Sequence, residues 1–307
     1  MTYARPARDI RPERPPLSVV AHRGASEEAP EHTLAAYRRA IEDGADALEC
    51  DVRLTADGHL VCVHDRRVNR TSNGRGAVSA LELSDLAALD FGSWKGQAAD
   101  HEAPDRDSTS VLTLERLLEL VADADRRVEL AIETKHPTRW AGQVEEKLLG
   151  LLDRFGLLGS PETPGSLGSL RAPGSLRAPG ALGAPGALGA PGEGGSSASQ
   201  VRVMSFSARS LHRVRAAAPA IPTVYLMQFI SPRHRDGRLP AGVRIAGPSI
   251  RIVRNHPDYV HRLHRAGHRV HVWTVNEPAD VELCAELGVD AVITNRPKQV
   301  LSQLDRR

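Results

Sequence analysis

The chain alternates short apolar segments with amphipathic ones, and this alternation limits the possible folds more than any other feature of its 307 residues. The apolar segments have the composition of strands that are covered on both faces. We place them at Ser18–His22, Ala47–Val52, Val128–Glu133, Val201–Ser205, Thr223–Met227, Val243–Ala246, Arg269–Thr274 and Ala291–Thr294. Helical spacing of apolar residues occurs between them, at Thr33–Glu42, Leu114–Ala122, Trp140–Phe155, Ala208–Ala217, Asp258–Arg265 and Ala279–Glu286.

Repeated strand–helix alternation predicts the α/β class and, within it, a (β/α)₈ or TIM barrel. The alternative is an open doubly wound sheet, which usually carries a glycine-rich phosphate loop after its first strand. No such loop follows Ser18–His22, so we favour the barrel. Barrels of this size are ordinarily one domain, which we expect to span residues 18–303.

Two segments interrupt the alternation. Residues 66–112 are polar and rich in turns, and they lie between the second strand and its helix, so we expect a small insertion on the catalytic face. Just before it, the turn signal Asp57-Gly58 predicts that Leu60–His64 folds back beside the second strand. Residues 161–200 repeat Ala-Pro-Gly, and this composition predicts a disordered insertion on the opposite face rather than a hexapeptide solenoid.

Composition excludes several classes of protein. The net charge of +2 and the aromatic content of 4% argue against a nucleic-acid-binding surface. The three cysteines are odd in number and lack metal-site spacing, so we expect no disulfide framework and favour a reducing compartment. Residues 1–17 are rich in Arg and Pro without the apolar core of a signal peptide, so we expect a disordered N-terminal extension. No apolar run is long enough for a membrane span, and we expect a cytoplasmic protein.

Acidic residues lie at the ends of the second and third predicted strands. Glu49 and Asp51 are two residues apart, so their side chains point to the same side of the strand, toward the barrel mouth. Glu133 can complete an all-oxygen site, which suits Mg²⁺ or Ca²⁺. Any one of these acids alone could simply pair with Arg53 or Lys135. Three of them at strand ends favour a site for a divalent cation.

Basic and titratable residues accompany these acids. His22 and His64 each end an apolar strand, and histidine can exchange a proton near neutral pH, so both are candidate acid–base residues. Arg23 and Lys135 could neutralise a phosphate group. Trp273 either lines a substrate pocket or belongs to the core. These residue types together predict metal-assisted attack on a phosphate ester.

Nine segments match, in order and spacing, the motifs of one enzyme family. They are AHRGASEEAPEHTLAAY, GADALECDVRLTADGHLVCVHD, NRTSNGRG, LDFGSWK, TLERLLEL, ELAIETKHP, VMSF, VHVWTVN and LGVDAVITNRP. With these segments the chain resembles the glycerophosphodiester phosphodiesterase family. The resemblance covers the chain except for the first seventeen residues and the Ala-Pro-Gly tract.

The resemblance implies a TIM barrel with a small inserted subdomain, acting on a small-molecule glycerophosphodiester in glycerophospholipid metabolism. The implied reaction is hydrolysis to sn-glycerol 3-phosphate and an alcohol. Implied roles are acid–base catalysis for His22 and His64, metal binding for Glu49, Asp51 and Glu133, and phosphate contact for Arg23 and Lys135. This chain departs from the family pattern at His32, where many members have Asn, and at Thr134, where Ile is more usual.

Several alternatives stay open at this point. The nucleophile is either water or the substrate's own adjacent glycerol hydroxyl, which would give a cyclic phosphate. We favour His22 as base and His64 as acid. Glu31 precedes the first helix and has either a capping or a catalytic role. Other candidate functions are lysophospholipase D-type cleavage, a phosphatidylinositol-type lyase reaction, and a catalytically silent phosphate- or polyol-binding module.

Overall fold

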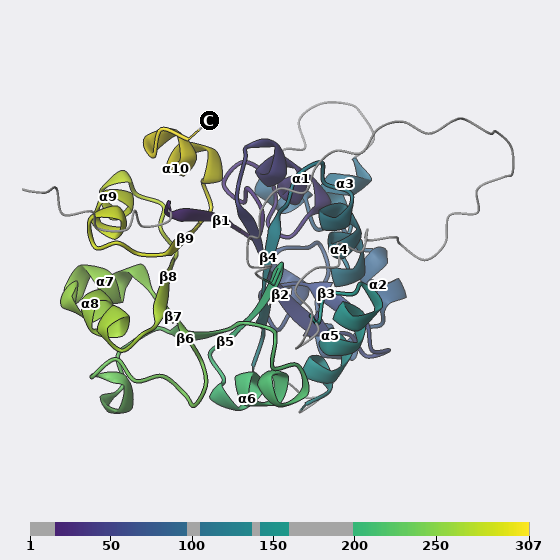
Figure 1. The fold of residues 1–307 in the computed structure, drawn as a ribbon. Helices are drawn as coiled ribbons and strands as arrows, with labels where there is room; N and C mark the ends of the chain where they lie inside the picture. Colours follow the sequence, from purple (N-terminus) through teal and green to yellow (C-terminus); the bar gives the residue numbers. More distant parts are fainter. Residues whose placement is uncertain (1–15, 97–104, 137–141, 160–198, 307) are drawn as a thin grey trace, which may run out of the picture.

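Nine strands form one sheet in the computed structural model, which describes residues 16–96, 105–136, 142–159 and 199–306 (Figure 1). The strands are β1 (Ser18–His22), β2 (Ala47–Leu54), β3 (Leu60–Cys62), β4 (Glu129–Thr134), β5 (Val201–Ser205), β6 (Thr223–Met227), β7 (Ile245–Pro248), β8 (Arg269–Trp273) and β9 (Ala291–Thr294). All pairings except β2–β3 are parallel, and β1 pairs with both β2 and β9. This pairing closes the ring and confirms the predicted TIM barrel.

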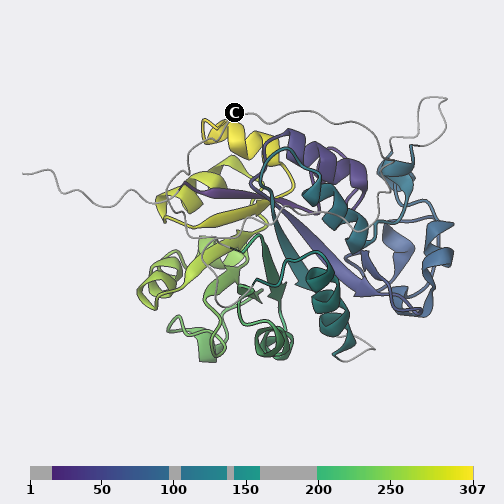
Figure 2. The ribbon, with the colours of Figure 1, turned by 45° about the vertical axis from the view of Figure 1, so that its right-hand side comes forward.

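Helices surround the ring of strands, as Figure 1 and the oblique view of Figure 2 show. The longer ones are α1 (Leu34–Glu42), α4 (Leu114–Ala122), α5 (Gln143–Arg154), α6 (Ala208–Ala217), α7 (Ile250–Asn255), α8 (Asp258–Arg265), α9 (Pro278–Glu286) and α10 (Pro297–Gln303). The expected helix at Thr33 begins one residue later, because the Thr33 hydroxyl accepts the Ala36 amide and caps the helix. Between β6 and β7 the described chain has only the 3₁₀ helix η4 (Pro232–His234).

The core has two layers, as a closed barrel requires. Inward-facing residues of different strands fill the ring, among them Val20, Ala131, Met204, Val224 and Ile293. Outward-facing residues pack against the helices in two larger clusters. The sixth expected strand, Val243–Ala246, starts two residues later in the structure: the Val243 amide donates to the Pro240 oxygen in a turn, so β7 starts at Ile245.

The expected hairpin after the second strand is present. Strand β3 pairs antiparallel with β2, with Val52 opposite Cys62. The described part of the insertion then contains η1 (Val68–Arg70), η2 (Val78–Ala80), α2 (Leu83–Ala87), η3 (Ser93–Lys95) and α3 (Arg106–Thr109). These short elements, blue in Figure 2, have their own apolar cluster with Val61 and Val63 beneath it. The insertion is therefore anchored to the hairpin that leads toward the site.

The predictions of disorder for 1–17 and 161–200 fall outside the described residues, apart from residues 16–17 and 199–200. The predicted boundaries of the barrel domain and of its insertions stay predictions. Among the helices that the structure describes, none combines the length and apolarity that crossing a membrane requires.

A tight turn after β1 depends on Gly24. Its φ is +82°, and a Cβ atom there would lie 2.6 Å from the carbonyl carbon of Ala36 and 2.7 Å from its oxygen. The next amide, that of Ala25, donates to the same oxygen at 2.9 Å. The missing side chain therefore lets the β1–α1 loop lie directly on helix α1.

Gly24→Ala is expected to lower the free energy of unfolding by about 3 kcal/mol, because it adds both left-handed strain and a clash with the helix backbone. Gly267→Ala is the matched control, since Gly267 has φ +80° but open space around its Cβ position. That control should cost only about 1 kcal/mol. Urea denaturation of both variants measures the difference, and equal losses would show that the close approach to α1 costs nothing.

Candidate active site

Three carboxylates from β2 and β4 meet: Glu49 and Asp51 lie within β2, and Glu133 lies next to the C-terminal end of β4. Asp51 stands beside Glu133 in the register of these two strands. One oxygen each from Glu49, Asp51 and Glu133 lie within 4.8 Å of one another, and all three side chains are buried. The structure thus brings together the acids that the sequence singled out, because parallel strands end at the same edge of the barrel.

Two basic residues lie against the three acids. The Arg23 amide donates to Glu49 Oε2 at 3.1 Å, and its Nε lies 2.9 Å from Asp51 Oδ2. Lys135 Nζ lies 2.9 Å from Asp51 Oδ1 and 2.8 Å from Glu133 Oε1. Both cations expected from the sequence are therefore in direct contact with the acidic cluster.

Burial and mutual repulsion separate the pKa values of the acids. Burial, followed by the charge of Asp51, raises the pKa of Glu133 to about 7 and holds the pKa of Glu49 well above its usual range. Burial acts in the same direction on Asp51, but Lys135, Arg23 and His32 outweigh it and hold the pKa of Asp51 well below its usual range. The two cations therefore favour the ionised form of Asp51, but they do not offset the effect of burial and of the Asp51 charge on Glu49 and Glu133.

The acidic cluster fits a divalent cation. Its donors are all carboxylate oxygens, the hard ligands that Mg²⁺ and Ca²⁺ take. The raised pKa values of Glu49 and Glu133 indicate that additional positive charge would be favourable between them. The structure therefore supports a possible metal site at these three residues.

His22 is oriented by a residue from the far end of the chain. Its Nδ1 lies 2.6 Å from Asn295 Oδ1, and its Nε2 lies 4.0 Å from Glu49 Oε2. The Asn295 oxygen also accepts the Ser26 hydroxyl at 3.1 Å, which leaves Nδ1–H of His22 as its second donor. Burial, reinforced by Arg23, lowers the pKa of His22 to about 3. His22 is therefore neutral, with its unprotonated Nε2 toward the acids.

Sequence reasoning did not assign a role to Asn295. It lies in the quoted segment LGVDAVITNRP, directly after β9. The backbone amide of Asn295 donates to Asn276 Oδ1 at 2.9 Å, and this hydrogen bond holds Asn295 in position. Nothing in the local sequence connects it to His22, because the two residues become neighbours only when β9 pairs with β1.

His64 lies just beyond β3 and is held by its neighbours. Its Nδ1 lies 2.7 Å from Asp65 Oδ1, and its backbone oxygen accepts Arg53 Nε at 3.0 Å and Nη2 at 2.7 Å. Arg53 thus fixes the backbone at His64 instead of pairing with the acidic cluster. Burial lowers the pKa of His64.

His32 contacts Asp51, the acid that lies between the two cations. It is buried, with Nε2 2.9 Å from Asp51 Oδ2 and Nδ1 2.8 Å from the Tyr37 hydroxyl. That hydroxyl is also 3.1 Å from the backbone oxygen of Glu49. His32, which stands where many family members have Asn, therefore connects Asp51 to Tyr37 of helix α1, and the Tyr37 hydroxyl contacts the backbone of Glu49.

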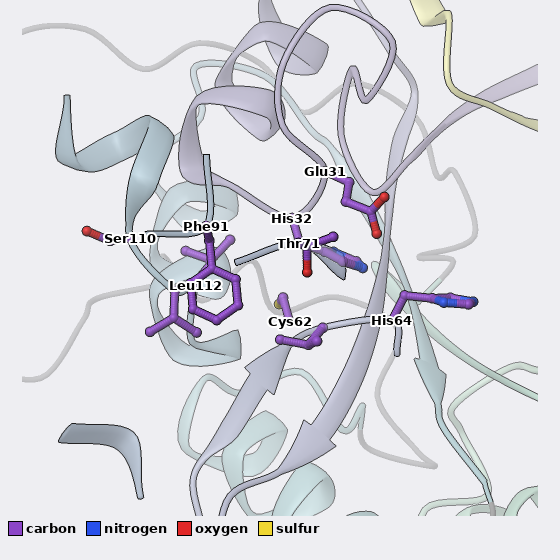
Figure 3. Close-up of a pocket in the computed structure, with 10 residues that line it drawn as sticks. Glu31, His32, Cys62, His64, Thr71, Phe91, Ser110 and Leu112 are labelled. Atoms are coloured by element: carbon purple, nitrogen blue, oxygen red, sulfur yellow. The ribbon is translucent and has the colours of Figure 1, made fainter. Parts of the chain in front are cut away.

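Glu31 does not cap helix α1, because Thr33 does so. Its carboxylate instead pairs with Arg23 at 3.0 Å and with Arg70 of the insertion at 2.7 Å. Burial would raise the pKa of Glu31, but Arg70 and Arg23 outweigh it and lower this pKa to about 2. Figure 3 shows Glu31, His32 and His64 lining one small pocket together with Thr71, Phe91 and Leu112 of the insertion and its end.

Trp273 packs against the core, one of the two roles that the sequence left open, and its role in a substrate pocket stays a prediction. Its Nε1 donates to Gly247 O at 2.7 Å, and its ring packs on the apolar residues inside the barrel. The ring of Phe206 meets it edge to face, with 5.4 Å between the centroids. Trp273 stays partly exposed at the end of β8, on the catalytic face.

Glu133→Gln is expected to change how stability depends on pH in the metal-free protein. Glu133 has a pKa of about 7 in the folded chain against 4.5 for an ordinary Glu, so the folded state keeps a proton that the unfolded state loses. This contribution to stability is therefore lost as pH rises from 4.5 to 7. In EDTA, the Tm of Glu133→Gln minus that of the wild type should increase across this window.

The difference in Tm between Glu133→Gln and the wild type isolates the effect of Glu133. Buried histidines such as His22 have lowered pKa values and act in the opposite direction, but they do so in both proteins. Melting curves followed by circular dichroism would measure the effect. A Tm difference that does not change with pH would contradict the raised pKa of Glu133.

Comparison with known proteins agrees with this arrangement. The model of the Glycerophosphoryl diester phosphodiesterase family matches residues 22–156 and 192–299. The "Probable glycerophosphodiester phosphodiesterase 1" of Mycobacterium tuberculosis H37Rv is 42% identical over 94% of this chain and 92% of its own length. The glycerophosphodiester phosphodiesterase of Bacillus subtilis is 32% identical over 92% of this chain and 84% of its own length.

Solved structures share the fold. A phosphodiesterase from Oleispira antarctica, in complex with the product sn-glycerol-3-phosphate, aligns with a TM-score of 0.69 at 23% identity over 95% of this chain and 97% of its own. A glycerophosphodiester phosphodiesterase from Agrobacterium tumefaciens aligns with a TM-score of 0.66 at 22% identity over 93% and 99% of the two chains. The family match and the 42% identity carry the assignment. The chain therefore belongs to the glycerophosphoryl diester phosphodiesterase family and is an enzyme of that family, a glycerophosphodiester phosphodiesterase.

Proposed function

We propose that this enzyme hydrolyses glycerophosphodiesters to sn-glycerol 3-phosphate and an alcohol, with Ca²⁺ or Mg²⁺ held by Glu49, Asp51 and Glu133. One observation carries the proposal: the three acids lie within 4.8 Å of one another, in contact with two cations and beside an oriented imidazole. The product named for the Oleispira antarctica structure supports the choice of sn-glycerol 3-phosphate.

Arg23 and Lys135 bind the phosphate group of the diester. Both now pair with carboxylates, at 2.9 Å from Asp51 in each case. A bound cation supplies Lewis-acid stabilisation of the charge that builds up on the phosphate oxygens. Arg23 and Lys135 can then direct donors to those oxygens, the Arg23 guanidinium through two parallel hydrogen bonds. Trp273 offers its partly exposed ring to the carbon skeleton of the substrate.

His22 acts as the general base. Its Nδ1 hydrogen is engaged by Asn295, so Nε2 is the atom that accepts a proton. Its low pKa, about 3, keeps it unprotonated at neutral pH before the reaction starts. Nε2 takes the proton of the nucleophile, which is water or the adjacent hydroxyl of the glycerol group.

His64 acts as the general acid. Its partner is a carboxylate, that of Asp65, whereas His22 has a neutral amide. Burial outweighs the Asp65 carboxylate and lowers the pKa of His64, whereas a bound anionic diester would favour the imidazolium form. His64 then donates its Nε2 proton to the departing alkoxide. The two histidines thus differ in the charge of the group that orients them.

Cleavage of lysophospholipids at the same site is the second candidate function. Phe206 and Phe229 follow β5 and β6 on the catalytic face and are 41% and 73% exposed. An apolar surface beside the barrel mouth could hold an acyl chain, whereas the insertion is mostly polar. This observation keeps a lysophospholipase D-type reaction in view as an activity of the same residues.

Release of glycerol 3-phosphate from glycerophosphocholine, followed through a coupled dehydrogenase, tests the proposal. The enzyme is first treated with EDTA and then supplied with Ca²⁺ or Mg²⁺. Metal-restored release supports both the reaction and the carboxylate site. Release of choline from lysophosphatidylcholine at a higher kcat/KM would favour the second candidate. No release from either substrate by folded, metal-supplied protein would contradict both.

A further inference from the structure

One arginine of the insertion joins two acids from separate parts of the barrel. Arg70 is the last residue of η1. Its Nε donates to Asp65 Oδ2 at 2.7 Å, while Nη1 and Nη2 donate to the two oxygens of Glu31 at 2.8 and 2.7 Å. Asp65 follows β3, and Glu31 lies in the loop between β1 and α1. The guanidinium therefore bridges the β1 and β3 sides of the barrel mouth.

Each of these two acids also contacts a residue of the proposed site. Asp65 Oδ1 lies 2.7 Å from His64 Nδ1. Glu31 Oε1 lies 3.0 Å from Arg23 Nη1, and Arg23 in turn contacts Asp51. A continuous line of ion pairs thus runs from His64 through Arg70 to the phosphate-binding arginine. Figure 3 shows Glu31 and His64 on adjacent segments beside one pocket.

We propose that Arg70 is a positioning residue that holds Asp65, and through it His64, in the orientation needed to protonate the leaving alkoxide. This inference rests on the proposed role of His64 as general acid. It deepens that role by naming Arg70, which lies in the quoted segment NRTSNGRG, as the group that keeps His64 in place relative to Arg23.

Packing alone does not hold this part of the site. The side chains of His64 and Asp65 are 36% and 32% exposed, so part of each faces solvent and is not restrained by packing. The hydrogen bond from His64 to Asp65 leaves Asp65 free to rotate unless its second oxygen is also held. Arg70 supplies that contact, and its planar fork fixes both acids in one geometry.

Arg70 contributes little to the core of the insertion. Its side chain is 44% exposed, and the buried residue of η1 is Val68. Its pair with Asp65 joins two partly exposed groups and adds little to stability, and Glu31, which is only 12% exposed, keeps Arg23 as a partner when Arg70 is replaced. Replacement of Arg70 is therefore expected to leave the fold intact and to act mainly on catalysis.

The leaving group of the substrate separates a positioning role from a structural one. A poorly acidic alcohol such as choline needs a proton as it departs, whereas p-nitrophenolate does not. A defect that acts through His64 must therefore be large for glycerophosphocholine and small for the p-nitrophenyl ester of glycerol 3-phosphate. A defect that acts through Arg23 or through the fold affects both substrates equally.

The test compares Arg70→Gln, Arg70→Lys and Arg67→Gln on these two substrates. Arg67 is an exposed neighbour whose side chain contacts Asn69, which makes it the matched control. We expect Arg70→Gln to lower kcat for glycerophosphocholine by about tenfold or more, and for the p-nitrophenyl ester by roughly threefold or less. Arg70→Lys keeps the charge but cannot bridge both acids, so it should lose nearly as much.

His64→Ala is measured on the same pair of substrates to separate two failures. If His64→Ala lowers kcat equally for both substrates, the proposed role of His64 is wrong, and the role inferred for Arg70 is then wrong as well. If His64→Ala shows the leaving-group dependence but Arg70→Gln does not, only the role of Arg70 is wrong. Activity of Arg70→Gln equal to that of Arg67→Gln would likewise overturn it.

Discussion

His22→Ala and His64→Ala are each expected to lower kcat for glycerophosphocholine by about 10²–10⁴-fold, the usual contribution of general acid–base catalysis. His22 is oriented by Asn295 to accept a proton, and His64 by Asp65 to donate one. The two variants should therefore differ with the p-nitrophenyl ester. With this ester, the kcat of His64→Ala should be close to that of the wild type, because p-nitrophenolate needs no proton to depart. The kcat of His22→Ala should stay low. Steady-state kinetics with both substrates provides the measurement.

His261→Ala is the matched control, because His261 is exposed on α8 and has no part in the site. It should keep the kcat of the wild type. Circular dichroism and thermal melting should show that all three variants are folded. Near-normal turnover by either site variant would contradict its assigned role. Recovery of His22→Ala alone with the p-nitrophenyl ester would reverse the assignment of base and acid.

Removal of the divalent cation is expected to abolish activity, and Glu49→Gln is expected to raise the metal concentration for half-maximal activity by about tenfold or more. Glu49 is one of only three carboxylates in the cluster, and its oxygen also accepts the Arg23 amide at 3.1 Å. Glutamine keeps the shape and an acceptor oxygen but removes the charge. The loss should therefore appear in metal affinity before it appears in stability.

Titration of activity with Ca²⁺ and Mg²⁺ after EDTA treatment measures this requirement, and calorimetry gives metal binding directly. Glu286→Gln is a suitable control, since Glu286 is an exposed acid on α9. Full activity after exhaustive treatment with EDTA would show that the carboxylates have another function. A Glu49→Gln enzyme with the metal requirement of the wild type would remove Glu49 from the set of ligands.

The barrel and the position of its acids were predictable because they depend on local patterns. Apolar strands alternating with amphipathic helices leave few ways to bury both faces of a parallel sheet. Once the strands are parallel, residues at their C-terminal ends must meet, and this alone brings Asp51 next to Glu133. The turn at Asp57-Gly58 likewise made the β2–β3 hairpin predictable.

Contacts between distant segments were not predictable in this way. Val243 has the residue type of a strand but belongs to a turn, because the connection from β6 lacks a helix in the described chain and must turn before β7. Glu31 and Thr33 are both suitable for capping α1, and only the structure shows that Thr33 caps it while Glu31 pairs with two arginines. The start of a strand and the partner of a side chain depend here on residues that are distant in the sequence and become neighbours only in the folded chain.

The sequence by itself determined the type of fold, and it singled out three acids, two histidines and two cations as candidate site residues. Only the tertiary structure decided which group orients each histidine: Asn295, 273 positions away, for His22, and Asp65, held by Arg70, for His64. The physical reason is that strand periodicity sets the direction of a side chain from its own neighbours along the chain. Hydrogen-bond partners across the barrel mouth are set by closure of the ring and by docking of the insertion.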